Sequence, residues 1–572
     1  MKINPINTIK EKYLYIFIFI FSLISIYSII SLNYNSTQGA DYAKYSNYLD
    51  YFLSNQEKTN LEQGLIYFYI IAFFVNLFTA RLNAENAEYI FSLGIQVGNF
   101  YIFIIGLIGL YLLLKLFNYP EKYIFLCLSL VCFFPQTISL LVTFKPEILA
   151  FSLLVWSIYF IEKYFKTESN IFLYISIFPL VLLMTTKGSV TGMVGIFILL
   201  KYRTKLKNID FKTLIYVLLL FLVFFSIILY ENYQENGLFI LDPPHDETIY
   251  NQKADIYVVY NINFKELLSK PYQHEHRDSL LGIYLLDTFD DYFQLYWNFD
   301  KSLFDQYRKD IFITNDSNNL ISIDFSNRNI AYNGPGNFYL MFLRQYIAIG
   351  LGLIFYYLMF SASRKNKYSK LFILSPLIGV LISVINSVFG FPQKNFDPSR
   401  ADVFKTFYFS FFIILSFAFV VMYLINNKSK LKAFLIPLYI ISIIFILGFP
   451  KANNDEFDYK ISENNKYSLT CNLNTPFLEA TLFETSNVDC PKVENIICSE
   501  EYFKKEGNNL ELQNINSKKV IVNSYESCIN FVSKNYTFVN NLELNKIPKF
   551  NLAIYLLFKL LIFYTIFKYE KK

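Results

Sequence analysis

Thirteen long apolar runs divide this sequence of 572 residues, and several of them reach eighteen residues or more. A helix needs roughly 20 apolar residues to cross a hydrocarbon core about 30 Å thick. Lipid offers no partner to a backbone amide, so such runs are expected to be helices. Hydrophobic residues make up 54% of the chain and charged residues 17%, which agrees with an all-α polytopic membrane protein. The runs cover about 13–32, 64–80, 89–114, 123–144, 147–162, 171–186, 188–200, 213–230, 337–360, 369–391, 403–425, 431–449 and 549–567.

The first run is expected to stay in the mature protein as a membrane span. It covers Tyr13–Leu32, which is longer than the apolar core of a signal peptide, and no small-residue cleavage site follows it. Lys2, Lys10 and Lys12 precede the run. Because basic residues are retained on the cytoplasmic side, the N-terminus is predicted to be cytoplasmic.

The second run, at 64–80, decides the topology of the rest of the chain. It is only about seventeen residues long and contains Asn76, which makes it marginal for a span. If it does not cross, the basic loops at 115–122, 163–170 and 201–212 all lie in the cytoplasm, as do those at 361–370 and 426–432. If it crosses, every one of these clusters moves outside, against the positive-inside rule. We therefore expect a juxtamembrane or re-entrant helix at 64–80, about twelve spans, and both termini inside.

Three long segments then face outward, at 33–88, 231–336 and 450–548. The third contains Cys471, Cys490, Cys498 and Cys528, and four cysteines in an exported segment predict two disulfides of undetermined pairing. We expect a transmembrane catalytic region at 1–449, a small extracytoplasmic disulfide-containing domain at 450–548, and a final span with a cytoplasmic tail at 549–572.

Acidic and basic side chains at the outer membrane edge are the best candidates for chemistry, because charge near hydrocarbon is costly. Asp41 follows the first span within "GADYAKYSNY", and Asp50 comes nine residues later. Glu147 lies in "TFKPEILAF", where Pro146 suits the first turn of a helix and a carboxylate would interact favourably with the helix dipole. A solvated loop aspartate and a capping glutamate are the plain alternatives. On the topology above, however, Asp41, Glu147 and Lys145 share the outer face.

Three further cations are expected on or near that face. Lys187 lies among small residues in "TTKGSVTG", Arg344 lies about two turns into the span after the large loop, and Arg400 opens a later span. Lys187 could simply extend its amine to the membrane surface. Guanidinium groups in such places suit phosphate oxygens, which they hold with two hydrogen bonds.

The segment 231–336 contains all three histidines and an acidic aromatic stretch. His274 and His276 alternate in "QHEHRD" and are weak candidates for a divalent metal, since no third ligand follows at a defined spacing. In "LLDTFDDYFQLYWNFD", acids including Asp287 mix with aromatic residues, which favours an amphipathic segment on the membrane surface. The net charge of +5 reflects loop lysines and gives no support for nucleic-acid binding.

The order of these features resembles the GT-C superfamily of membrane glycosyltransferases, in particular the dolichyl-phosphate-mannose protein mannosyltransferase and ArnT-like group. A first span is followed by "GADYAKYSNY", then by "LEQGLIYFYIIAFFVNLF" as the juxtamembrane helix, then by "KPE" at the next outward turn. The likeness covers about residues 1–210. The chain has a lone Asp41 where the family usually has two adjacent acids, and "EQG" where Pro-Pro is common. "GADYAKYSNY" also resembles the start of Wzy-like polysaccharide polymerases.

The resemblance implies an inverting transfer of a sugar from a polyprenyl-phosphate carrier to a glycan, lipid or protein acceptor. It implies Asp41 as the general base and Glu147 as a second acidic residue, with Lys145, Lys187, Arg344 and Arg400 available to the leaving phosphate. We expect a bacterial inner-membrane protein whose active site faces the periplasm or exterior. The sequence implies no definite cofactor, and a divalent metal is the one candidate. A Wzy-like polymerase, a membrane transporter and a non-catalytic scaffold are the alternatives.

Overall fold

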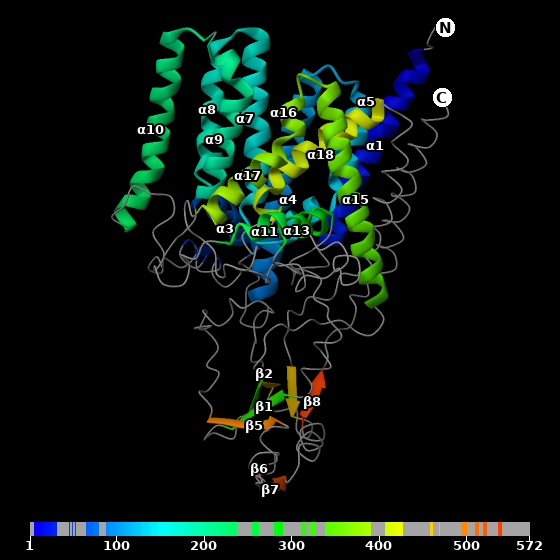
Figure 1. Cartoon of the computed structure of the whole chain (residues 1–572), viewed down its shortest axis with the longest axis vertical. Coiled ribbons are helices and arrows are strands. Elements are labelled where there is room, and N and C mark those ends of the chain that lie inside the picture. The colour runs from blue at the N-terminus through cyan, green and yellow to red at the C-terminus, as the bar shows by residue number, and fades with distance from the viewer. Residues whose placement is uncertain are drawn as a thin grey trace.

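The protein is a bundle of helices followed by short strands, as seen in a computed structural model (Figure 1). The structure describes residues 5–30, 45, 48–49, 52, 64–78, 87–207, 209–236, 254–261, 279–289, 310–315, 321–325, 338–389, 406–426, 458–461, 468–469, 494–499, 510–513, 519–522 and 536–539. The helices in the first half of the chain are α1 (Pro5–Ile30), α3 (Ile66–Phe78), α4 (Ala87–Leu116), α5 (Glu121–Cys132), α6 (Pro135–Val142), α7 (Glu147–Thr167), α8 (Asn170–Met184), α9 (Gly188–Leu206) and α10 (Phe211–Asn236). Those that follow are α11 (Tyr257–Tyr260), α13 (Leu280–Asp287), α15 (Phe338–Lys365), α16 (Lys370–Ile373), α17 (Ser375–Val388), η5 (Thr406–Phe409) and α18 (Ser410–Asn426).

Helices occupy the apolar runs predicted from the sequence wherever the structure describes them. Within the described residues, four helices are long and apolar enough to cross a membrane. They are Leu93–Leu116, Glu147–Thr167, Tyr346–Lys365 and Thr406–Ile425, and the bent pair α5–α6 would make a fifth. Shorter apolar helices include Tyr13–Tyr27, Asn170–Met184 and Phe211–Ile227. The chain is therefore a helical protein with the features of an integral membrane protein.

One end of the bundle gathers basic residues at helix termini, and we call it the lysine-rich end. Lys166 Nζ donates to the carbonyl oxygen of Leu116 at 3.1 Å, and Lys201 Nζ donates to that of Tyr368 at 2.6 Å. The first bond joins the ends of α4 and α7, and the second joins α9 to the α15–α16 turn, at the top of Figure 1. Of the basic loops that the positive-inside rule assigned to one side, those at 115–122, 163–170, 201–212 and 361–370 lie toward this end in their described residues, and 427–432 lies outside the described residues.

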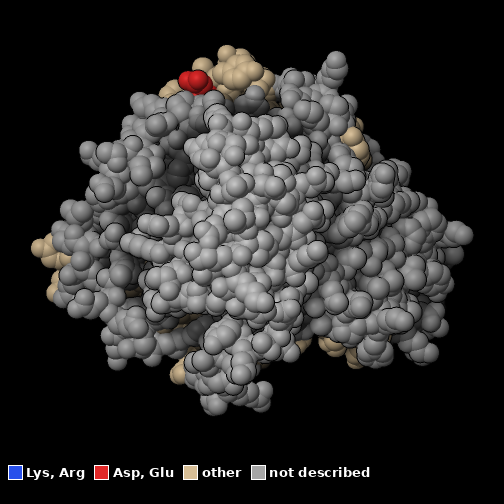
Figure 2. All heavy atoms as spheres, turned by 90° about the horizontal axis from the view of Figure 1, so that it is seen from below, with Lys and Arg blue, Asp and Glu red and all other residues tan. Residues whose placement is uncertain are grey.

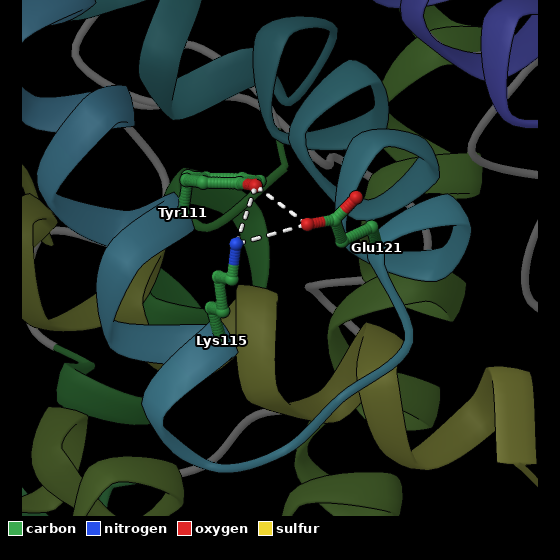
Figure 3. A network of polar contacts seen from close by, with 3 residues as sticks. All are labelled: Tyr111, Lys115 and Glu121. Carbon is green, nitrogen blue, oxygen red and sulfur yellow. Dashed lines mark hydrogen bonds and ion pairs between the residues drawn. The ribbon is translucent and has the colours of Figure 1, made fainter.

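The turn between α4 and α5 is held by a small polar network at this end (Figure 3). Lys115 Nζ lies 2.9 Å from Glu121 Oε1, and the Tyr111 hydroxyl donates to the same oxygen at 3.2 Å. Lys115 Nζ also donates to the Tyr111 hydroxyl at 3.5 Å. Lys115 lies in the last turn of α4 and Glu121 in the first turn of α5. Each charge is therefore favourably placed with respect to its own helix dipole.

The expected span at 123–144 is two helices rather than one. α5 ends at Cys132, α6 begins at Pro135, and their axes differ by 59°. Pro135 occupies the first turn of α6, where its missing N–H costs nothing, but it could not continue α5 without losing a hydrogen bond. The break brings the C-terminal end of α6 beneath α4, close to the residues described below as the candidate site.

Helix α3, in the doubtful run at 64–80, lies against the outer third of α4. A Cβ on Gly94 would lie 2.6 Å from the Val75 Cα, and the Phe74 ring stacks on Tyr101 at 5.1 Å. At the other end of α3, the Gly64 N–H donates to the Thr186 carbonyl oxygen at 3.2 Å. Both ends of α3 therefore contact residues at the end of the bundle opposite the lysine-rich end. Whether the run crosses a membrane stays a prediction.

We call this opposite end the Glu147 end, after the residue at the start of α7. It lies at the lower side of the helices in Figure 1. Figure 2 shows the molecule from this side, with acidic colour at the edge of the view. Lys115, Lys166 and Arg203, toward the lysine-rich end, are exposed.

Short antiparallel strands lie within the segments at 231–336 and 450–548, while the described residues of the apolar runs are helical, as expected. The strands are β1 (Asp310–Asn315), β2 (Ile321–Phe325), β3 (Asp458–Ile461), β4 (Ser468–Leu469), β5 (Glu494–Ser499), β6 (Leu510–Gln513), β7 (Lys519–Val522) and β8 (Tyr536–Val539). Their order is β2-β1-β5 in one sheet, β4-β3-β8 in a second and β6-β7 in a third. In the first sheet Ile311 pairs with Cys498. The large segment at 231–336 and the cysteine-containing segment at 450–548 therefore share a sheet.

The expectation that Asp287 belongs to a membrane-surface segment is wrong. Asp287 ends α13 and is only 5% exposed, while Ile283 and Phe289 beside it are fully buried. A Cβ on Gly352 of α15 would lie 2.8 Å from the Leu285 carbonyl oxygen, so α13 packs directly on that helix. Only Leu285–Asp287 of the predicted amphipathic stretch belong to α13, and residues 290–300 lie outside the described residues. Asp287 itself faces another part of the protein instead of water.

Candidate functional site

Glu147 is the first residue of α7 and is completely buried. Pro146 precedes it as the N-cap residue with φ −71° and ψ −10°, so the "KPE" sequence starts the helix as predicted. The carboxylate lies at the positive end of the helix dipole, a favourable position for an acidic side chain. Capping of α7 alone does not explain the environment of Glu147, however, because the carboxylate also pairs with a lysine at the start of another helix.

Lys187 supplies that partner, although 40 residues separate it from Glu147. Its Nζ lies 3.1 Å from Glu147 Oε1, and the two side chains are 17% and 0% exposed. Lys187 is the N-cap residue of α9 and has extended backbone angles, φ −165° and ψ 141°. A buried pair of this kind keeps two charges inside the protein only because each compensates the other.

The second oxygen of Glu147 has no hydrogen-bond partner among the described residues. Glu147 Oε2 is buried and unpaired, whereas Oε1 is held by Lys187. An unpaired carboxylate oxygen in a buried position is costly and usually indicates a ligand, a water molecule or a catalytic role. The pair therefore presents a free acceptor at the Glu147 end of the bundle.

Lys145 lies two residues before Glu147 and is also buried, at 4% exposure. Its Nζ lies 5.0 Å from the centre of the Tyr45 ring and 5.8 Å from that of Phe407. In the same way, Lys187 Nζ lies 4.3 Å from the Tyr408 ring. Aromatic faces attract cations, so these three rings make favourable contacts with the two amines.

Tyr45 connects this cluster with the segment that contains Asp41. Its ring is 1% exposed and packs on Phe144 at 5.7 Å and on Phe68 of α3 at 5.4 Å. Tyr48, three residues later, stacks on Phe68 at 4.0 Å. The "GADYAKYSNY" stretch, α3 and the "KPE" turn thus meet in one aromatic cluster.

The short segment between α6 and α7 is fixed by Asn99 of α4. Its Nδ2 donates to the Thr143 carbonyl oxygen at 2.7 Å and to that of Leu141 at 3.2 Å. Its Oδ1 accepts a hydrogen bond of 2.9 Å from the Tyr67 hydroxyl. Asn99 therefore satisfies carbonyl groups that the end of α6 leaves without intrahelical partners.

Tyr67 of α3 adds a buried phenol close to Glu147. Burial, and secondly the negative charge of Glu147, raise the pKa of the Tyr67 phenol well above its usual range. Tyr67 therefore remains a neutral hydrogen-bond donor at all physiological pH values. We call Lys145, Glu147, Lys187 and Tyr67, with the rings of Tyr45, Phe407 and Tyr408, the Glu147 site.

The other predicted site residues are not brought into this cluster by described contacts. Asp41, Arg400, His274 and His276 lie outside the described residues, as do Cys471, Cys490 and Cys528. Arg344 lies in α15, and Cys498 lies in β5, but their side chains are not described. Within the described residues, no group of three His, Cys, Asp or Glu side chains could hold a metal ion.

Glu162, the remaining acidic residue inside a predicted span, belongs to the lysine-rich end. Its Oε2 lies 3.2 Å from Lys205 Nζ, and its Oε1 lies 3.5 Å from Lys201 Nζ. The residue is thus paired near the end of α7 rather than placed at mid-membrane. A proton or ion pathway through the bundle would need charges nearer its centre.

Three residues at the Glu147 site or in contact with it were not selected from the sequence. Tyr67, Asn99 and Tyr408 lie in apolar or aromatic stretches, and tyrosine is among the most frequent residues of this chain, with 47 copies. Asn99 is the one that a closer inspection of the sequence could have found, since it is a polar residue within an otherwise apolar span.

No protein-family model matches this chain, and no curated protein sequence is detectably similar to it. The fold and the site together define the class of the protein only as a helical integral membrane protein with a buried ion pair at one end of the bundle.

Proposed function

We propose that the protein is a membrane glycosyltransferase of the GT-C type, which moves a sugar from a polyprenyl-phosphate carrier to a glycan, lipid or protein acceptor. The observation that supports this most strongly is the Glu147 site itself. The buried amine of Lys145, the partly buried amine of Lys187 and a buried carboxylate with one unpaired oxygen lie at the end opposite the lysine-rich end. The reaction takes place on the extracytoplasmic side of a bacterial inner membrane.

The amines suit the leaving group of this reaction. Cleavage of the sugar–phosphate bond leaves a polyprenyl phosphate with a developing negative charge, which preorganised cations stabilise. Lys187 also begins α9, and the first N–H groups of a helix form a favourable site for phosphate. Gly188 and Ser189 follow it, so no large side chain obstructs a phosphate at this helix end. Arg344 and Arg400 are the further cations available to the phosphate.

The carboxylates suit the other half of the reaction. Asp41 takes the proton from the acceptor hydroxyl as the acceptor oxygen bonds to the anomeric carbon. At the same time the bond between the anomeric carbon and the phosphate oxygen breaks. General base catalysis of this kind contributes typically about 10²–10⁴-fold. Direct displacement inverts the anomeric configuration. Glu147 Oε2 accepts a hydrogen bond from a hydroxyl of the bound sugar.

Asp41 is restricted to the neighbourhood of this site by chain length. It precedes Tyr45 by four residues, and four residues span at most about 14 Å. Tyr45 itself lies against Lys145 and Phe144. Chain length thus allows the proposed base to reach the cations that would receive the leaving phosphate.

The test uses the full-length protein reconstituted in vesicles with polyprenyl-phosphate-linked sugars as donors. We expect release of polyprenyl phosphate together with appearance of the sugar on an acceptor from the host envelope. A preparation that shows normal folding but releases no polyprenyl phosphate from any donor in such a panel would contradict the proposal. Products that lengthen by whole oligosaccharide units would indicate a polymerase instead.

A further inference from the structure

One of the aromatic rings on each of the two lysines of the Glu147 site comes from a short element, η5. Phe407 lies over Lys145 and Tyr408 over Lys187, at 5.8 and 4.3 Å from ring centre to Nζ. Consecutive residues of a single turn thus contact cations on two different parts of the chain. The position of η5 therefore decides where both aromatic faces lie.

Asp287 holds the first residue of that element. Its Oδ2 accepts a hydrogen bond of 2.8 Å from the Thr406 N–H and a second, short one from the Thr406 hydroxyl. The Thr406 hydroxyl also accepts from Gln136 Nε2 at 3.2 Å. All three side chains are buried. A carboxylate that accepts the first N–H of a helical segment acts as its cap, but here the cap comes from α13, 119 residues away in sequence.

A second contact strengthens the connection between α13 and η5. The Tyr284 ring of α13 lies edge-on to the Phe409 ring of η5 at 5.6 Å. Phe409 is completely buried. η5 is therefore fixed at both of its ends by α13, which belongs to the large segment between α10 and α15.

We propose that Asp287 is a positioning residue of the Glu147 site. Through Thr406 it holds η5 so that Phe407 and Tyr408 stay on Lys145 and Lys187, and thereby keeps both amines in place for an anionic phosphate. The segment at 231–336 thus contributes to the site from a distance. The catalytic consequence rests on the proposed function, whereas the connection from Asp287 to the lysines does not.

The connection is tested by labelling Lys187 with an amine-reactive reagent and measuring its modification by mass spectrometry in the folded, full-length protein. In Asp287→Ala we expect Lys187 to be modified about two- to fivefold faster. This is the change that corresponds to losing a cation–π contact at the weaker end of the usual range. Tyr408→Ala should give a similar increase. Combining the two substitutions should add nothing further, because both act on the same contact.

Two pairs of variants keep this test independent of folding. Thr406→Ser retains the hydroxyl and should match the wild type, whereas Thr406→Val has the same shape without it and should behave as a weaker form of Asp287→Ala. Asp210→Ala serves as the matched control, since Asp210 accepts the Thr213 N–H at 2.8 Å at the start of α10, beside the lysine-rich end. It should leave Lys187 labelling unchanged.

Unchanged Lys187 labelling in folded Asp287→Ala, or an additive effect in the double variant, would overturn the proposal. If the labelling changes as expected and Asp287→Ala also raises the KM for the polyprenyl-phosphate donor more than it lowers kcat, the catalytic part holds as well. If labelling changes while even the wild type shows no sugar transfer, the positioning role stands and the proposed function fails.

Discussion

Lys187 Nζ lies 3.1 Å from Glu147 Oε1, although two complete helices, α7 and α8, separate these residues in the chain. The pair joins the N-terminus of α7 to that of α9 at one end of the bundle. Its surroundings contain two further features that the sequence placed near the outer membrane edge, Lys145 and the segment around Tyr45. The contact therefore defines both how the helices meet and where chemistry could occur.

The first prediction concerns the stability of this pair. Lys187→Met leaves the Glu147 carboxylate buried without its cation, so we expect the free energy of unfolding to fall by about 3 kcal/mol. Adding Glu147→Gln should restore part of that loss, because the uncompensated charge is removed. Thermal unfolding in detergent measures both effects. The control is Lys205→Met, whose amine is 38% exposed beside Glu162 and should cost at most about 1 kcal/mol. Equal losses for the two lysines would show that burial does not distinguish them.

The second prediction tests the contact between α3 and the turn before α9. A Cβ at Gly64 would lie 1.7 Å from the Thr185 carbonyl oxygen. Gly64→Ala must therefore push the start of α3 away from Lys187, and we expect lower thermal stability and reduced activity. A Cβ added at Gly195 of α9 would have no described atom within 4 Å. Gly195→Ala should be neutral or stabilising by up to about 1 kcal/mol, since alanine favours helix. A tolerated Gly64→Ala would disprove this close approach.

The third prediction concerns Asn99. Asn99→Ala removes the donor to the Thr143 and Leu141 carbonyl groups and the acceptor of Tyr67. Each buried polar group left without a partner costs about 1–3 kcal/mol, so the variant should lose considerably more stability than Asn170→Ala. Asn170 makes one hydrogen bond, to Thr213 Oγ1 at 3.0 Å. The comparison is made by thermal unfolding of both variants in the same detergent, and an equal cost would contradict the role assigned to Asn99.

The helices were predictable from the sequence because each long apolar run must form one in lipid. Pro135 also signalled the break between α5 and α6, although a single span was expected there. The strands were not predicted, since each is only two to six residues long, and the pairing of β1 with β5 joins residues nearly two hundred positions apart.

The candidate site was predictable only in part. Lys145, Glu147 and Lys187 could be selected because a charge at a membrane edge is rare and costly. Their mutual contact depends on how α7 and α9 pack, and no local pattern encodes it. Asp287 was misjudged for a related reason, since its mixture of acids and aromatic residues is equally compatible with a surface helix and with a buried cap on η5. Tertiary contacts decided between them.

The fourth prediction addresses the topology. In a variant without native cysteines, a cysteine at position 85 should react with an impermeant reagent added from outside, whereas Asn118→Cys should not. Asn118 lies in the turn between α4 and α5, beside Lys166 at the lysine-rich end. The pattern follows if the run at 64–80 does not cross and the basic loops are cytoplasmic. The reverse pattern would mean that α3 is a true span and that the Glu147 site faces the cytoplasm.

The most direct test of the proposed function compares Asp41→Asn with Asp50→Asn in the vesicle assay. Asp41 is the proposed base, and Asp50, nine residues later, would point about 180° away from it on a continuous helix. We predict that Asp41→Asn inserts normally but loses transfer from polyprenyl-phosphate donors by at least about 100-fold, while Asp50→Asn retains it. Full transfer in the Asp41→Asn variant would contradict the mechanism and remove Asp41 from it.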